Sequence, residues 1–151
     1  MRKVKTASFI AMSTVMLYGC GNSAPPECDN AEVLGLVTEI FHNHIRDQLV
    51  PLAIMQVIGV HPSMFGDATY ASFKATMAED PQSKQVVDFI DGRLATVPEI
   101  RYEGIRTIKR DTETHRSTCA AQLRGGDTGQ ADAHYTAQWT DDGRLYVEAR
   151  F

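Results

Sequence analysis

The histidines are the first side chains to consider for chemistry, because imidazole binds metal ions and also acts as an acid or base. His42 and His44 lie two positions apart, whereas His61, His115 and His134 are scattered along the chain. On a helix, residues two apart point about 200° away from each other, so the close pair cannot share one ion. The other three could meet only through the fold. The sequence therefore predicts no metal site and no cofactor.

Two other segments have residue types that occur in binding loops. Asp141-Asp142-Gly143 offers two carboxylates, but an EF-type calcium loop needs further oxygen ligands and a distal glutamate that are missing here. The glycine-rich run at 125–129 leads into no helix that could cradle a phosphate. No Gly-x-Ser-x-Gly motif supplies a nucleophile. These patterns favour turns, and the sequence predicts no catalytic residue and no enzymatic activity.

The N-terminus has the layout of a secretory signal peptide. Arg2, Lys3 and Lys5 precede an apolar run at 7–17, which ends in Leu17-Tyr18-Gly19-Cys20. This ending resembles the lipobox of bacterial lipoproteins, in which the cysteine is lipidated and becomes the first residue of the mature chain. The alternatives are an ordinary signal peptide or a membrane helix with an incidental cysteine. The apolar run is shorter than the roughly 20 residues that a span needs.

This interpretation divides the chain into a lipoprotein signal peptide (1–19), a flexible tether (20–27) and a single domain (28–151). The lipid on Cys20 would be the contact with the membrane. Without the signal, the chain keeps 12 basic and 19 acidic residues, a net charge of −7. Nucleic acids select positively charged surfaces, so we expect no nucleic-acid partner.

The cysteines predict one crosslink. If Cys20 carries lipid, Cys28 and Cys119 are left as an even pair in an oxidising compartment. The alternative is two unpaired, buried thiols. Because Cys28 begins the longest helix pattern and Cys119 lies on the apolar side of a strand pattern, the bond would clamp helix to sheet.

Periodicity of 3.6 in the first half of the domain indicates helices. The pattern predicts one from about Asn30 to Leu49, capped by Asp29 and stopped near Pro51; one capped by Asp67 that ends near Ala78; and one that starts at Asp80-Pro81 and ends before Pro98. The segment 52–60 is apolar without a clean period. It is either a buried helical turn or a binding surface, for which the candidate residues are Leu52, Ile54, Met55, Val57 and Ile58.

After Pro98 the period changes to two, which indicates strands. The first strand contains Ile100 to Ile108, with a bulge at Glu103-Gly104, and the others span about Ser117 to Arg124, Ala133 to Thr140 and Leu145 to Phe151. The loop between the last two strands sets their register. A three-residue loop with Gly143 in the left-handed position pairs Trp139 with Leu145 and keeps apolar residues on one face.

We therefore expect an α+β domain with N-terminal helices on one face of a four-stranded antiparallel meander. The curvature of cystatin-like or NTF2-like folds would suit it. The predicted inner face is apolar: Cys119, Ala121, Leu123, Tyr135, Ala137, Trp139, Leu145 and Val147. The opposite face is polar, and Thr136 and Gln138 on it are candidate binding residues.

Several segments also carry a resemblance: Ile105-Arg106-Thr107, Cys119 to Leu123, Tyr135 to Gln138 and Thr140 to Val147, together with Cys28 and its helix. They resemble a loose group of small, mostly uncharacterised proteobacterial envelope lipoproteins. The resemblance implies a lipid-anchored protein that faces the periplasm and performs no reaction. Gly21 at the second mature position favours the outer membrane over the inner membrane.

Two classes of function remain open. The first is a non-enzymatic domain that binds another envelope protein or has a structural role. The second is a small-molecule-binding or hydrolytic protein with a pocket inside the concave face of the sheet. The apolar inner face favours the first class.

Overall fold

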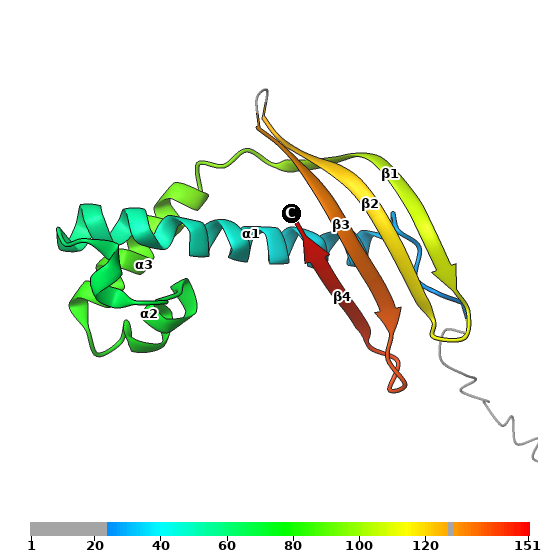
Figure 1. Cartoon of the computed structure of the whole chain (residues 1–151), viewed down its shortest axis with the longest axis horizontal. Helices are drawn as coiled ribbons and strands as arrows, with labels where there is room; N and C mark the ends of the chain where they lie inside the picture. The colour runs from blue at the N-terminus through cyan, green and yellow to red at the C-terminus, as the bar shows by residue number, and fades with distance from the viewer. Residues whose placement is uncertain (1–23, 127–128) are drawn as a thin grey trace, which may run out of the picture.

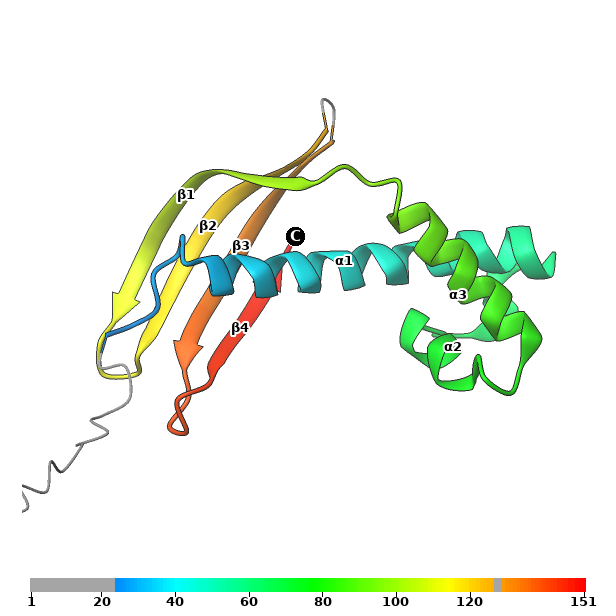
Figure 2. The ribbon, with the colours of Figure 1, turned by 180° about the vertical axis from the view of Figure 1, so that it is seen from behind.

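The computed structural model describes residues 24–126 and 129–151, and shows three α-helices beside a four-stranded antiparallel open sheet (Figure 1). The strands follow each other in the order β1-β2-β3-β4. The predicted α+β class and meander are confirmed. The sheet curves around the first half of the long helix α1, and the shorter helices gather at the other end of α1 (Figure 2).

Helix α1 runs from Ala31 to Ala53 and is longer than predicted. Its N-cap is Asn30, not Asp29, because the Asn30 Oδ1 atom accepts the amide hydrogens of Glu32 and Val33. The helix also continues through Pro51. A proline inside a helix costs about 3 kcal/mol, but Pro51 is exposed, and the residues after it enter a core. Burial of large aliphatic side chains there, at about 1.5–3 kcal/mol each, offsets the cost.

The segment that follows α1 is helical as well. Ile54–Ile58 form a π-helix that ends at Gly59, whose φ of 79° is left-handed. A 3-10 helix, Pro62–Phe65, comes next, and then α2, Tyr70–Thr76. The predicted cap of α2 is wrong: the Thr69 hydroxyl and the Ser72 side chain form the capping box, and Asp67 lies outside it.

Helix α3, Pro81–Leu94, begins as predicted. The Asp80 carboxylate accepts the amide hydrogens of Gln82 and Ser83, and also the Ser83 hydroxyl. The Ser83 bond is the main reason that the pKa of Asp80 lies below its usual range. A proline at the first helical position needs no donor, so this sequence is a strong helix start.

The four strands are β1 Ile100–Asp111, β2 Arg116–Gly125, β3 Gly129–Trp139 and β4 Leu145–Arg150. The pairing of β1 with β2 shifts between Glu103 and Arg106, where Gly104 has a φ of 60°, so the predicted bulge is confirmed. A second shift falls between Thr107 and Lys109.

The β3–β4 register is also the predicted one. Trp139 lies opposite Leu145, and Gly143 takes a φ of 78° in the loop. The Thr140 amide donates to the Arg144 carbonyl at 2.9 Å, and the Gly143 amide donates to the Thr140 carbonyl at 2.8 Å. The carboxylates of the Asp141-Asp142-Gly143 segment thus belong to a turn.

Two separate cores flank the middle of α1. The sheet lobe buries Val33 and Val37 of α1 against the inner face of the strands. The helical lobe buries Val50, Ala53 and Ile54 against residues of α2 and α3. Among the strands, α1 packs most closely on β4, and α2 and α3 pack on α1 and on each other. One helix therefore belongs to both cores and joins the two lobes.

Candidate binding surface

Most of the inner face of the sheet is covered by the fold. The five predicted central members, Cys119, Ala121, Leu123, Tyr135 and Ala137, are buried. The three at the β3–β4 end, Trp139, Leu145 and Val147, are half-buried. Phe151 closes this side with an edge-to-face contact to Phe41 of α1, at a ring-centroid distance of 4.8 Å. The α1 side chains thus occupy the part of the concave face that they cover.

Polar groups in this core are paired as well. The Tyr135 hydroxyl donates to the Cys28 carbonyl at 2.7 Å, and burial raises the pKa of Tyr135 to about 12. The Tyr102 hydroxyl donates to the Leu34 carbonyl at 3.0 Å, and burial raises its pKa too. Among the described residues, no buried side-chain nitrogen or oxygen lacks a hydrogen-bond partner. Nothing in this core presents an unused polar group to a substrate.

The chain enters the sheet lobe through a covalent clamp. Cys28 and Cys119 form a disulfide bond with an S–S distance of 2.02 Å, as predicted, and both residues are buried. Pro25 and Pro26 are buried too, and the Ser117 hydroxyl donates to the Pro26 carbonyl at 2.6 Å. Pro25 and Pro26, which the sequence assigned to the tether, thus pack against the sheet lobe. Cys20 and the signal segment lie outside the described residues.

The histidines do not converge. His44 is exposed and bonds to Gln48, and His61 caps the 3-10 helix by accepting the Ser63 amide. His115 sits in the β1–β2 turn with a φ of 49°, and His134 lies on the outer face of β3. Within residues 24–126 and 129–151, no three histidine, cysteine, aspartate or glutamate side chains are close enough together to hold a metal ion.

The candidate residues after Pro51 are mostly part of the helical core. Ile54 is 2 % exposed, and Val57 and Ile58 pack against the same cluster. Leu52 is half-buried, and Met55 is 50 % exposed. The structure therefore favours the buried helical turn over the binding surface for this segment. Among these five candidates, Met55 alone is exposed.

Thr136 and Gln138, the other candidates, lie on the outer face of the sheet among charged side chains. The register places Lys109, Thr118, Thr136 and Glu148 in one cross-strand row. The row beside it is Arg106, Ala120, His134 and Arg150. On the other side of the Thr136 row, Arg116 pairs with Gln138. We call the exposed residues Arg106, Lys109, Arg116, His134 and Arg150 the basic band.

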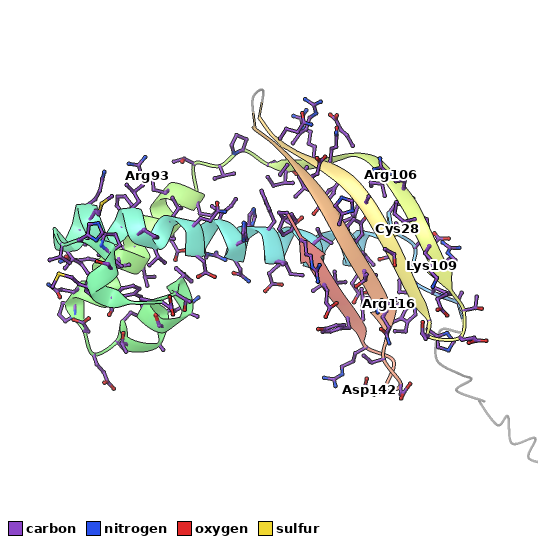
Figure 3. The ribbon with its side chains drawn as sticks, viewed as in Figure 1. Cys28, Arg93, Arg106, Lys109, Arg116 and Asp142 are labelled. Carbon is purple, nitrogen blue, oxygen red and sulfur yellow. A yellow bond between two sulfur atoms is a disulfide. The ribbon has the colours of Figure 1, made fainter. Side chains whose placement is uncertain are left out.

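A shallow groove of about 540 Å³ runs over this face. Its lining includes Arg116, Thr118, His134, Thr136 and Arg150, with Glu148 as the one acidic side chain among its residues. Figure 3 shows Arg106, Lys109 and Arg116 over the sheet, and Arg93 at the far end of the molecule on the helical lobe. The sequence predicted the polar face, but its average charge gave no signal for a local concentration of cations.

An apolar hollow of about 250 Å³ lies between α1 and the β2–β3 end of the sheet. Phe41 and Ile45 of α1 face Val97, Ile100 and Leu123 across it. Its lining contains no titratable side chain, so it could hold an apolar group but offers no acid, base or nucleophile.

No helix in the described part of the chain is both long and apolar enough to cross a membrane. Comparison with known proteins gives no further assignment: no protein-family model, no curated protein and no solved structure matches this chain.

Proposed function

We propose that this protein is a lipid-anchored, periplasm-facing component of the bacterial cell envelope that binds another envelope protein and catalyses no reaction. The outer membrane is the proposed location, in preference to the inner membrane. Cys20 would carry the lipid, and the outer face of the sheet around Thr136 and Gln138 would bind the partner. This is a binding or structural role, and the proposal includes no cofactor.

The proposal rests on the difference between the two faces of the sheet: the inner face packs against the core, and the outer face is polar and exposed. Most of the inner face is covered by α1, and the disulfide bond and paired hydroxyl groups fix it there. The outer face holds a dense set of exposed polar side chains on a rigid platform. Rigid elements position binding groups precisely and lose little conformational entropy when a partner binds.

Site-specific photo-crosslinking in cells tests the binding surface. A photoreactive residue at Thr136 or Gln138 should give one defined crosslinked product. The same residue at Gln82 or Gln85, which are exposed on α3, serves as the matched control. Crosslinks from α3 without any from the sheet would contradict the proposed surface.

Lipidation is tested separately. Cys20→Ser should abolish labelling by a radioactive or alkyne fatty acid and release the protein from the membrane fraction. In a sucrose gradient, the wild-type protein should sediment with the outer membrane. Lipid anchoring at Cys20 would be contradicted if Cys20→Ser left the amount of protein in the membrane fraction unchanged and the wild type carried no lipid label.

The absence of catalysis predicts tolerance at the histidines. Alanine at His42, His44, His61 or His115 should leave the crosslinking yield at Thr136 unchanged. His134 lies in the basic band, so His134→Ala should lower the crosslinking yield at Thr136 without changing the melting temperature. The proposal would fail if one of these changes abolished a catalysed conversion while the melting temperature stayed constant.

The apolar hollow supports a second candidate function, the binding of a small apolar molecule in the concave side of the sheet. Its lining of Phe41, Ile45 and Ile100 suits an alkyl or aromatic group. N-phenyl-1-naphthylamine should then gain fluorescence with the protein, and Ala131→Phe, which fills the hollow, should remove the gain. An equal gain in both proteins would refute this candidate.

A further inference from the structure

The distribution of charge over the molecule is uneven. The helical part, residues 39–97, carries seven acidic and four basic side chains. The centre of the outer sheet face, by contrast, carries the four arginine and lysine side chains of the basic band, with Glu148 at one end of the Thr136 row and with Glu103, Asp111 and Asp132 in the flanking rows. Charges farther apart than about 8–10 Å are screened at physiological salt, so a local band acts on a partner despite the net negative charge.

The register fixes the spacing of the cations. Arg106, Ala120, His134 and Arg150 occupy successive strands in one row, and neighbouring strands lie about 4.8 Å apart. The row is therefore about 14 Å long at the backbone. Ala120 is only 2 % exposed, since its two larger cross-strand neighbours shield it.

The band is poorly neutralised by the protein itself. In the described ranges, Arg106 and Arg150 form no ion pair. Arg116 is 3.9 Å from Glu148, and Lys109 is 4.0 Å from Asp111. Exposed pairs at such distances contribute little. The guanidinium groups can therefore still bind the carboxylates of a partner.

The surroundings of the band distinguish between two kinds of anionic partner. The turns at one end of the sheet place Glu113, Asp141 and Asp142 beside it, all exposed. A flat anionic bilayer that contacted the band would also approach these carboxylates. A narrow acidic segment of a protein can lie over the row and stay clear of these turns, with exposed Glu103, which pairs with Arg124, and Asp132 in the next row as its nearest like charges. Complementarity of charge and shape thus favours a protein segment over a lipid surface.

We propose that the basic band binds an acidic segment of a protein partner, with carboxylates that span about 14 Å across the four strands. The inference rests on the proposed binding role of the outer face and assigns the chemistry of its partner. Arg106 and Arg150 hold the two ends of the segment, Lys109 contacts it from the neighbouring row, and Arg116 adds positive charge one row farther away.

Fluorescence anisotropy with labelled hexaglutamate tests this assignment, using the full-length protein in a non-ionic detergent at low salt. The wild type should bind hexaglutamate and not hexalysine, and added salt should weaken the complex. Arg106→Gln with Arg150→Gln should lower the affinity about tenfold. Lys84→Gln with Arg93→Gln changes the net charge equally on α3 and should alter it less than twofold. Arg106→Lys with Arg150→Lys, which keeps both charges, should retain most of the affinity.

Three results would overturn the inference. One is no binding of hexaglutamate by the wild type, and another is an equal loss in the α3 control. The third is complete competition by mixed micelles of phosphatidylglycerol, which would assign the face to lipid. Crosslinking at Thr136 is a separate measurement, so a partner captured there without hexaglutamate binding would retain the proposed function and reject only the acidic partner.

Discussion

Removal of the Cys28–Cys119 bond should strongly destabilise the sheet lobe. The two cysteines are 91 positions apart. Closing a loop of this length lowers the entropy of the unfolded chain by an amount worth about 4–5 kcal/mol. We therefore expect Cys28→Ala with Cys119→Ala to lower the free energy of unfolding by about 4 kcal/mol. For a domain of this size, the melting temperature should fall by roughly 15 °C.

The single tryptophan makes the measurement specific. Trp139 lies at the end of β3, so its fluorescence reports the sheet lobe, whereas far-UV circular dichroism at 222 nm reports mainly the helices. Unfolding in guanidinium chloride should show a large shift of the fluorescence transition and a smaller shift of the helical one. Thr107→Val is the matched control, because it removes the hydroxyl 3.3 Å from the Cys28 Sγ atom and keeps the bond.

Two outcomes would refute parts of this reasoning. A loss below about 1 kcal/mol in the fluorescence transition would show that the unfolded chain gains little entropy when the bond is removed. Equal shifts of both transitions would show that the two cores unfold as one unit, in spite of their separation along α1.

The remaining predictions concern single side chains. Tyr135→Phe should cost about 1–3 kcal/mol, because the buried Cys28 carbonyl loses its donor. Because the folded pKa of Tyr135 is about 12 and the unfolded value about 10, wild-type stability should fall as pH rises from 10 to 12. Tyr135→Phe should flatten that fall, and an unchanged slope would reject the role of Tyr135. Asn30→Ala should cost about 1 kcal/mol in urea unfolding and Asp29→Ala much less, whereas the reverse order would restore Asp29 as the cap. Gly143→Ala should cost about 1 kcal/mol, because φ is 78°, whereas Gly35→Ala in the second turn of α1, where a Cβ meets open space, should stabilise by about 0.5–1 kcal/mol. Equal effects of the two glycine changes on the melting temperature would contradict the assigned backbone conformations.

The sheet could be predicted from the sequence in detail because it depends on local turn residues and on the alternation of side chains between the two faces of each strand. A three-residue β3–β4 loop keeps the apolar side chains of both strands on one face, whereas a two-residue loop does not. This requirement predicted the pairing of Trp139 with Leu145. The phase change in β1 located the bulge near Gly104. The Cys28–Cys119 pair followed from assigning Cys20 to the lipid, and the direction of Cys119 and the position of Cys28 agreed with it.

The helical part was harder to predict because tertiary packing decides it. Pro51 and the apolar segment after it suggested an end of the helix, and only the core formed by α2 and α3 explains why the helix continues. The choice between neighbouring caps, Asp29 and Asn30, depends on backbone angles that residue types do not reveal. The separation into two cores likewise depends on tertiary packing, because one end of α1 packs on the sheet and the other end packs on α2 and α3.

The candidate surface was predicted only in part. Alternation assigned Thr136 and Gln138 to the polar side of the sheet, and the structure agrees. The basic band could not be predicted, because its members come from four strands and the acidic residues elsewhere make the net charge of the chain negative. Register alone brings Arg106 and Arg150 into one row, although they are more than forty residues apart in the chain.

The disulfide bond also determines how mechanical tension would travel through the molecule. A pull on the N-terminus passes Pro26, reaches Cys28 as the first covalent junction, and continues through the disulfide bond to Cys119 in β2, the strand between β1 and β3. The Ser117 contact to Pro26 enters the same strand two residues earlier. Helix α1 begins after this junction, so a load between the N-terminus and the outer sheet face bypasses it. The helical lobe would carry no tension and would keep its shape while the sheet lobe is held under force.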